Sequence, residues 1–68
     1  MKVRLREIRL MRGMTQEELA RAVGVSRQTI NYIERGKYKP SVMLALKLSE
    51  ILKVGVEELF ELEESDWK

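Results

Sequence analysis

The feature that most constrains this chain is a pair of short amphipathic segments separated by Gly24. Leu19 and Val23 are four residues apart in the first segment, and Ile30 and Ile33 are three apart in the second. These intervals place each apolar pair on one side of an α-helix. A glycine between the segments permits the backbone conformation that ends a helix abruptly. The pattern predicts two helices joined by a tight turn and packed through their apolar sides.

The ends of both helices are marked by residues that satisfy free backbone groups. Thr15 followed three residues later by Glu18 matches a capping box, in which a hydroxyl and a carboxylate bond the first amides of a helix. Ser26 is a suitable N-cap for the second helix, and Gly36 is a suitable stop. We therefore expect a helix-turn-helix unit over residues 16–35.

The second helix carries hydrogen-bonding side chains on the side opposite its apolar residues. These outward residues are Arg27, Gln28, Asn31 and Tyr32. The chain has three carboxamide residues, and Gln16, Gln28 and Asn31 all lie within the helix-turn-helix unit. Asparagine and glutamine can form paired hydrogen bonds with adenine in the major groove of DNA, and arginine with guanine. The pattern predicts a helix that contacts base edges.

Several stretches resemble the Cro/C1-type helix-turn-helix repressors of phages and prokaryotes, over about residues 5–60. They are LREIR, TQEELA, VGVS, QTINYIERGKYKPS, ALKLSEIL and VEELF. The resemblance implies a mainly α, five-helix, lambda-repressor-like fold. It implies that Gln16 contacts a phosphate and braces the second helix of the unit. It also implies that Arg27 and Gln28 contact bases, with Asn31 or Tyr32 contributing one turn later.

A first helix is expected from Leu5 to just before Gly13, on the basis of apolar residues spaced by three. These are Leu5, Ile8 and Met11. Arg9 lies beside this stripe, and the resemblance pairs it with Glu34 near the end of the second helix of the helix-turn-helix unit. We expect a largely buried ion pair between Arg9 and Glu34.

The residues after Gly36 combine basic side chains with the start of another helix. Lys37, Tyr38 and Lys39 precede a proline and the N-cap Ser41, an arrangement that suits a phosphate clamp or, alternatively, an ordinary helix connector. The full set of candidate phosphate contacts is Gln16, Ser26, Thr29, Arg35, Lys37, Tyr38 and Lys39.

A fourth helix is expected from about Ser41 to Val54, ended by Gly55, and a short fifth helix over VEELF. The expected core residues of the fourth helix are Leu44, Leu48, Ile51 and Leu52. Those of the fifth helix are Val56, Leu59 and Phe60.

Both ends of the chain alternate apolar and charged residues, which is typical of strands. Basic side chains alternate near residues 1–4 and acidic ones near residues 60–64, so the two segments have complementary charge. We expect them to pair as a small antiparallel sheet at the two-fold interface of a homodimer. The candidate interface residues are Val3, Phe60, Leu62 and Trp67. The alternative is a frayed acidic tail.

Length and composition predict one domain over residues 1–68 and exclude several kinds of site. The chain contains no cysteine and no histidine, so thiolate metal sites, disulfides and the usual general base are absent. We expect no enzyme activity, cofactor, metal or small-molecule ligand, and a core too small for a ligand pocket. Without a signal segment or a long apolar run, we expect a cytoplasmic protein with no membrane contact.

Charge is distributed unevenly along the chain. Residues 1–53 contain twelve Lys or Arg against five acids, for +7, whereas residues 54–68 contain one Lys against six acids, for −5. A basic body with an acidic tail suits a protein that binds a polyanion on one side. The alternatives are a simply solvated surface or a composition selected for thermal stability.

The leading hypothesis is a homodimeric, sequence-specific regulator of transcription, a repressor that binds a near-palindromic double-stranded DNA site. One alternative is an antitoxin that also neutralises a toxin. Another is a helical protein-interaction module that does not bind DNA.

Overall fold

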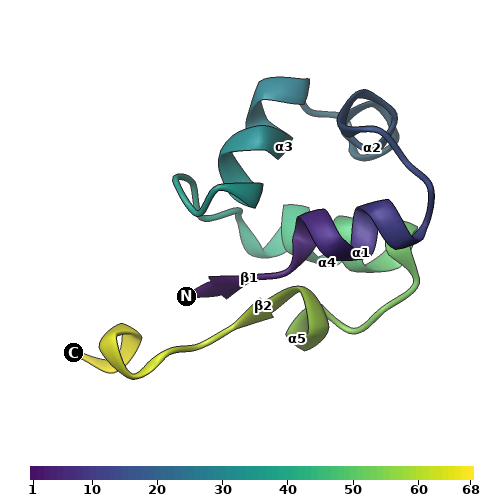
Figure 1. The fold of residues 1–68 in the computed structure, drawn as a ribbon. Helices are drawn as coiled ribbons and strands as arrows, with labels where there is room; N and C mark the ends of the chain where they lie inside the picture. Colours follow the sequence, from purple (N-terminus) through teal and green to yellow (C-terminus); the bar gives the residue numbers. More distant parts are fainter.

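The computed structural model describes all 68 residues and shows five α-helices and a two-stranded sheet (Figure 1). The helices are α1 (Leu5–Met11), α2 (Gln16–Val23), α3 (Arg27–Glu34), α4 (Val42–Leu52) and α5 (Val56–Leu59). The strands are β1 (Lys2–Val3) and β2 (Phe60–Glu61), and the chain ends in a 3-10 helix, η1 (Glu64–Trp67). The expected five-helix, mainly α fold is confirmed.

One apolar core holds the helices together, and every α-helix contributes to it. Its residues are Leu5, Leu19, Ala20, Val23, Ile30, Ile33, Leu44, Leu48, Leu52 and Leu59. The four apolar residues that predicted the helix-turn-helix unit are all less than 5% exposed. Because α2 packs on both α3 and α4, the unit rests on α4.

The predicted helix ends around α2 and α3 are confirmed. The Thr15 hydroxyl accepts a hydrogen bond from the Glu18 amide at 3.0 Å, and the Glu18 carboxylate accepts one from the Thr15 amide at 2.8 Å. Gly24 has a φ of +79°, in the left-handed region that favours glycine. The Ser26 hydroxyl caps α3 by accepting from the Thr29 amide at 3.2 Å. These local contacts determine where the turn begins and ends.

The end of α4 differs from the expectation. Lys53, not Gly55, adopts the left-handed conformation that ends the helix, with a φ of +58°. Gly55 has a φ of −72° and serves as the N-cap of α5, where its amide donates to the Glu58 carboxylate at 2.7 Å. Glycine was expected at the stop because non-glycine residues rarely adopt positive φ. Phe60, expected in the fifth helix, belongs to β2.

Three residues expected in the core lie outside it: Val56, which is only partly buried, Ile51 and Met11. Ile51 is 39% exposed because the buried side of α4 is the narrow row formed by Leu44, Leu48 and Leu52. Met11 is 72% exposed because it occupies the last position of α1, where the chain turns away from the core.

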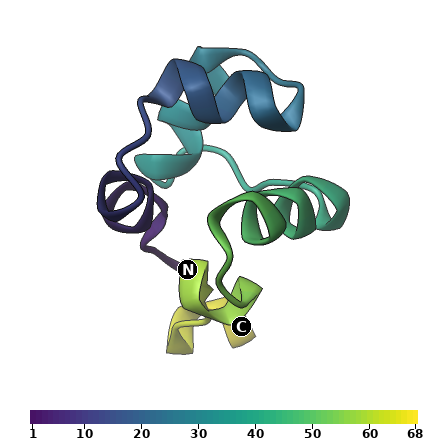
Figure 2. The same cartoon turned by 90° about the vertical axis from the view of Figure 1, so that its right-hand side faces the viewer.

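The predicted antiparallel pairing of the chain ends is confirmed, and it forms within one chain. Lys2 pairs with Glu61 and Val3 with Phe60, so the strands are shorter than the expected segments. Val3 and Phe60 are partly buried against the core, whereas Leu62 is 60% exposed. Both chain ends lie at the end of the molecule away from α2 and α3 (Figures 1 and 2).

Polar contacts between the termini position the acidic tail. The Met1 amine lies 2.8 Å from the Glu63 carboxylate and 2.9 Å from that of Asp66, and both hydrogen bonds raise the pKa of the amine. The pKa of Asp66 is lowered by a hydrogen bond from the Glu63 backbone and by the amine. The Arg4 guanidinium pairs with Glu61 and lowers the pKa of that carboxyl. The tail therefore forms η1 instead of fraying.

A tryptophan near the chain end is expected to dock either at a dimer interface or on the fifth helix, and Trp67 does not pack on α5. It is 77% exposed, because η1 extends beyond the helical body (Figure 1). Its other expected position, at a dimer interface, stays a prediction.

Candidate nucleic-acid interface

The outward side of α3 is exposed while its inner side is fully buried. Arg27, Gln28 and Tyr32 are exposed, and Asn31 is partly buried. The Gln28 amide nitrogen donates to the Tyr32 hydroxyl at 2.8 Å, one turn further along. The structure thus brings all four candidate base-contacting side chains onto one helix, and it ties two of them together.

Arg27 occupies a position that is unfavourable for the helix itself. It is the first residue of α3, whose first turn contains no acidic residue. A cation near a helix N-terminus interacts unfavourably with the helix dipole, by typically 0.3–1 kcal/mol. Since no ion pair of the structure includes Arg27, its guanidinium is available to an external anion or base.

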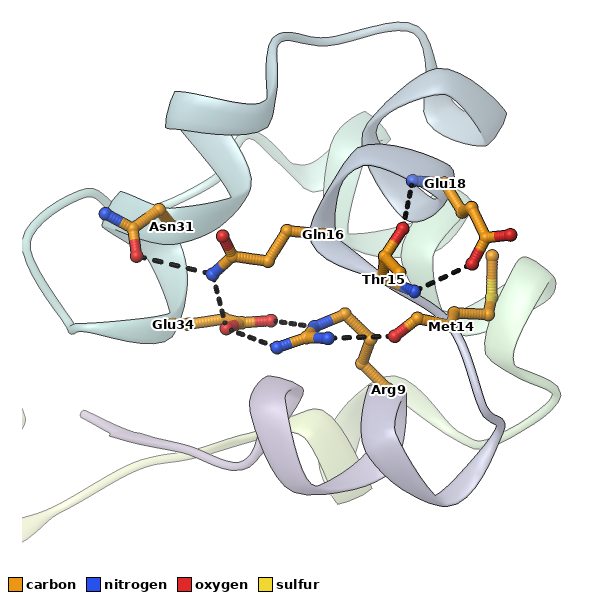
Figure 3. A network of polar contacts seen from close by, with 7 residues as sticks. All are labelled: Arg9, Met14, Thr15, Gln16, Glu18, Asn31 and Glu34. Atoms are coloured by element: carbon orange, nitrogen blue, oxygen red, sulfur yellow. Dashed lines mark hydrogen bonds and ion pairs between the residues drawn. The ribbon is translucent and has the colours of Figure 1, made fainter.

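Beneath α3 lies the expected ion pair between Arg9 and Glu34 (Figure 3). The Arg9 Nε atom is 2.6 Å from Glu34 Oε2, and the two side chains are 8% and 3% exposed. Arg9 Nη2 donates to Glu34 Oε1 at 3.2 Å, and Nη1 donates to the Met14 carbonyl at 2.8 Å. This pair connects α1 to α3 and to the segment that leads into α2.

Gln16 extends this network toward the outward side of α3. Its Nε2 atom donates to Glu34 Oε1 at 3.0 Å and to Asn31 Oδ1 at 3.3 Å (Figure 3). Gln16 therefore braces α3, as the family resemblance implied. Both side-chain N–H groups are used in these bonds, so a side-chain contact to phosphate would require one of them to break.

Five of the six remaining candidate phosphate contacts lie at the two ends of α3. Ser26 and Thr29 are at its start, where their hydroxyl oxygens are 3.0 Å apart. Arg35, Lys37 and Tyr38 follow its end and are exposed. A helix in the major groove has a phosphate backbone on either side, so this placement suits the expected role.

Lys39 is separated from this group. It lines a groove with Met1, Pro40 and Phe60 beside the terminal sheet. Its charge also contributes to lowering the pKa of Asp66 in the tail, after stronger effects from the Glu63 backbone and the Met1 amine. Lys37, Tyr38 and Lys39, which connect α3 to α4, therefore do not form a single phosphate-binding cluster.

Sequence reasoning missed two supports of this surface. The Met14 carbonyl accepts a bond from Arg9, and the Arg12 Nε atom donates to the Leu52 carbonyl at 2.8 Å, which joins the ends of α1 and α4. Both acceptors are backbone carbonyls, which every residue has, so the amino-acid type at these positions does not reveal the contact.

None of the helices combines the length and apolar character needed to cross a lipid bilayer.

Comparison with known proteins relates the whole fold to regulators of transcription. A family model described as helix-turn-helix matches residues 5–59. An HTH-type transcriptional regulator of Archaeoglobus fulgidus is 52% identical over 60 residues, which cover 88% of this chain and 86% of the relative. The HTH-type transcriptional regulator YgzD of Bacillus subtilis is 44% identical over 66 residues, which cover 97% and 100%.

Two solved structures have closely similar folds. The restriction-modification controller protein C.AhdI of Aeromonas hydrophila has a TM-score of 0.77 at 40% identity, covering 84% of this chain and 86% of its own. The N-terminal DNA-binding domain of SinR from Bacillus subtilis has a TM-score of 0.77 at 31% identity, with 90% of both chains covered.

Proposed function

Since this chain belongs to the Cro/C1-type helix-turn-helix family of transcriptional regulators, we propose that it is a homodimeric, sequence-specific repressor. Two copies of α3 would enter successive major grooves about 34 Å apart on a near-palindromic double-stranded DNA site. Bound there, the dimer would cover the site and exclude other proteins from it.

The observation that carries this proposal is the contrast between the two sides of α3. Ile30 and Ile33 on the inner side are 0% exposed, so the helix is firmly seated. On the outer side, Arg27, Gln28 and Tyr32 offer donors and acceptors to solvent. Such a rigidly held row of hydrogen-bonding groups fits the major groove, where each base pair presents a distinct pattern.

We expect Gln28→Ala and Lys37→Ala to weaken DNA binding in different ways. The duplex would first be enriched from a random-sequence library by the wild-type protein. On that duplex, Gln28→Ala should cost about 1–3 kcal/mol and relax the preference at one base pair, because it removes a base contact. Lys37→Ala should weaken binding to enriched and random duplexes alike, because a phosphate contact carries no sequence information. Electrophoretic mobility shifts measure both affinities.

Arg21→Ala provides a matched control for the loss of an exposed cation. Arg21 lies on α2 beside Lys47 and Ile51 of α4. We expect it to leave both affinities unchanged. Equal losses on the two duplexes for Gln28→Ala would remove Gln28 from the base contacts, and failure of the wild-type protein to enrich any sequence would refute the proposal.

Exposed apolar residues at the terminal sheet support dimerisation through that end of the molecule. Leu62 and Trp67 are 60% and 77% exposed. They follow β2, whose Phe60 borders an apolar groove of roughly 340 Å³. The proposed interface consists of Val3, Phe60, Leu62 and Trp67. An apolar groove bordered by Phe60, with exposed apolar residues directly after it in the chain, suits a protein contact.

Trp67→Ala is expected to weaken the dimer by about 2 kcal/mol or more, because a buried interface tryptophan commonly contributes that much. Leu62→Asp should have a similar effect by placing a charge in the interface. Sedimentation equilibrium measures the dimer dissociation constant. The control is Leu10→Asp on α1, where the leucine is 54% exposed and does not belong to the proposed interface. A wild-type protein that stays monomeric with and without DNA would contradict the dimer.

A further inference from the structure

We propose that Asn31 contacts guanine and not adenine, because the buried ion pair beneath α3 determines which amide atoms face the DNA. The inference rests on the proposed function, in which α3 lies in the major groove. Hydrogen bonds connect Arg9 through Glu34 and Gln16 to Asn31, and the donor and acceptor in each bond determine the orientation of the Asn31 amide (Figure 3).

The buried Arg9–Glu34 pair determines which groups donate and which accept in this hydrogen-bond network. The Arg9 guanidinium has only donors and remains protonated in proteins. It donates to both carboxylate oxygens of Glu34, and the Glu34 side chain is only 3% exposed. The ionised carboxylate of Glu34 can therefore only accept hydrogen bonds, including the one from Gln16.

Gln16 extends this constraint to the Asn31 amide on α3. Because Glu34 Oε1 accepts, the Gln16 amide must turn its nitrogen toward it, at 3.0 Å. The second hydrogen of the same nitrogen goes to Asn31 Oδ1 at 3.3 Å. The carbonyl oxygen of Asn31 is therefore turned inward, and Figure 3 shows its amide nitrogen on the opposite side. Reversing the Asn31 amide would bring two N–H donors face to face and break this bond.

The outward group of Asn31 therefore offers two N–H donors. Guanine presents two neighbouring acceptors in the major groove, N7 and O6. Adenine presents one acceptor and one donor, so a bidentate contact with adenine needs the amide oxygen as well as the nitrogen. Since that oxygen is turned inward toward Gln16 and only the amide nitrogen faces outward, guanine is the matching base. Sequence pattern alone favoured adenine, since it does not show which amide atoms are already bonded.

Gln28 on the same helix is the natural comparison. It is exposed and bonded only to the Tyr32 hydroxyl, through Nε2. Its oxygen and its second N–H have no partner in the structure, so both atoms needed for adenine are available. The two carboxamides of α3 therefore differ in what they can recognise.

The test uses the full chain and the duplex that the wild-type protein enriches from a random library. The base pair whose preference is relaxed by Asn31→Ala defines the Asn31 position, and we expect guanine there. Replacing this guanine by adenine or 7-deazaguanine should lower wild-type affinity on the order of ten-fold, which is the loss of one good base contact. The same replacements should leave the affinity of Asn31→Ala unchanged.

Gln16→Met tests the origin of the preference. It removes the donor to Asn31 with little change in side-chain size, and it leaves the Arg9–Glu34 pair in place. We expect the ratio of guanine to adenine affinities at the Asn31 position to fall to about 1, because the amide can then turn. The ratio at the Gln28 position should not change. Gln28→Met, the matched control, should alter only the Gln28 position.

Four results would overturn the inference. They are adenine as the preferred base at the Asn31 position, no relaxed base pair in Asn31→Ala, no loss of affinity with 7-deazaguanine, and an unchanged ratio in Gln16→Met. A wild-type protein that enriches no sequence would overturn the proposed function together with this inference. Enrichment of a defined site with adenine opposite Asn31 would overturn the inference alone.

Discussion

Glu34→Ala is expected to lower the free energy of unfolding by about 3–5 kcal/mol, because it leaves the Arg9 guanidinium buried without its partner. Arg9 is 8% exposed and gives two of its hydrogen bonds to Glu34, so solvent cannot replace the lost carboxylate. A chain of 68 residues has a total stability of roughly 3–10 kcal/mol. The expected loss is therefore a large share of the total stability, and the unfolded fraction of the variant should rise more than a hundred-fold over that of the wild-type protein, about tenfold for each 1.4 kcal/mol.

Thermal or urea unfolding followed by circular dichroism measures this loss. For a domain of this size, the expected change lowers the Tm by at least about 12 °C. Glu17→Ala is the matched control, because Glu17 and Arg21 form an ion pair at 3.6 Å whose side chains are 58% and 77% exposed. Its loss should be about 0.5 kcal/mol or less. A Glu34→Ala variant that unfolds near the wild-type temperature would show that the pair contributes little.

Raising the salt concentration from about 50 to 200 mM is expected to weaken DNA binding on the order of 10³-fold or more, for a dimer making 6–10 phosphate contacts. The reason is the release of counterions from DNA phosphates as basic side chains replace them. Residues 1–53 of each protomer carry a charge of +7, and the acidic residues 54–68 belong mostly to the opposite end of the molecule.

Fluorescence anisotropy of a labelled duplex at several salt concentrations gives the slope of log affinity against log salt. Lys37→Ala should reduce that slope by about 1 for each protomer, whereas Arg21→Ala should leave it unchanged. An affinity that hardly varies with salt would contradict phosphate binding, and it would favour a module that recognises protein.

Features that depend on neighbouring residues could be predicted from the sequence. The capping box at Thr15, the left-handed Gly24 and the N-cap Ser26 each depend on a few adjacent positions. The buried sides of α2 and α3 follow from a repeat of three or four residues. Such signals are local, so they persist whatever surrounds them.

Features that depend on distant segments could not be predicted in the same way. Lys53 ends α4 in a left-handed conformation, although Gly55 stands two residues later and instead caps α5. Ile51 has the right spacing for the core, but it lies at the edge of the buried row of α4, where it borders an open groove with Arg21 of α2. The bond from Gln16 to Asn31 required the relative placement of α2 and α3. The family resemblance implied a brace and left its partner atoms open.

The network beneath α3 also has a consequence for how such a protein could evolve toward a new target site. Asn31 shares hydrogen bonds with Gln16, which is bonded to the ion pair that stabilises the fold. Arg27, Gln28 and Tyr32 have no contact with that pair, so mutation can exchange them without endangering folding. Divergence among descendants of this chain should accordingly begin at those three positions, while the base opposite Asn31 is inherited unchanged.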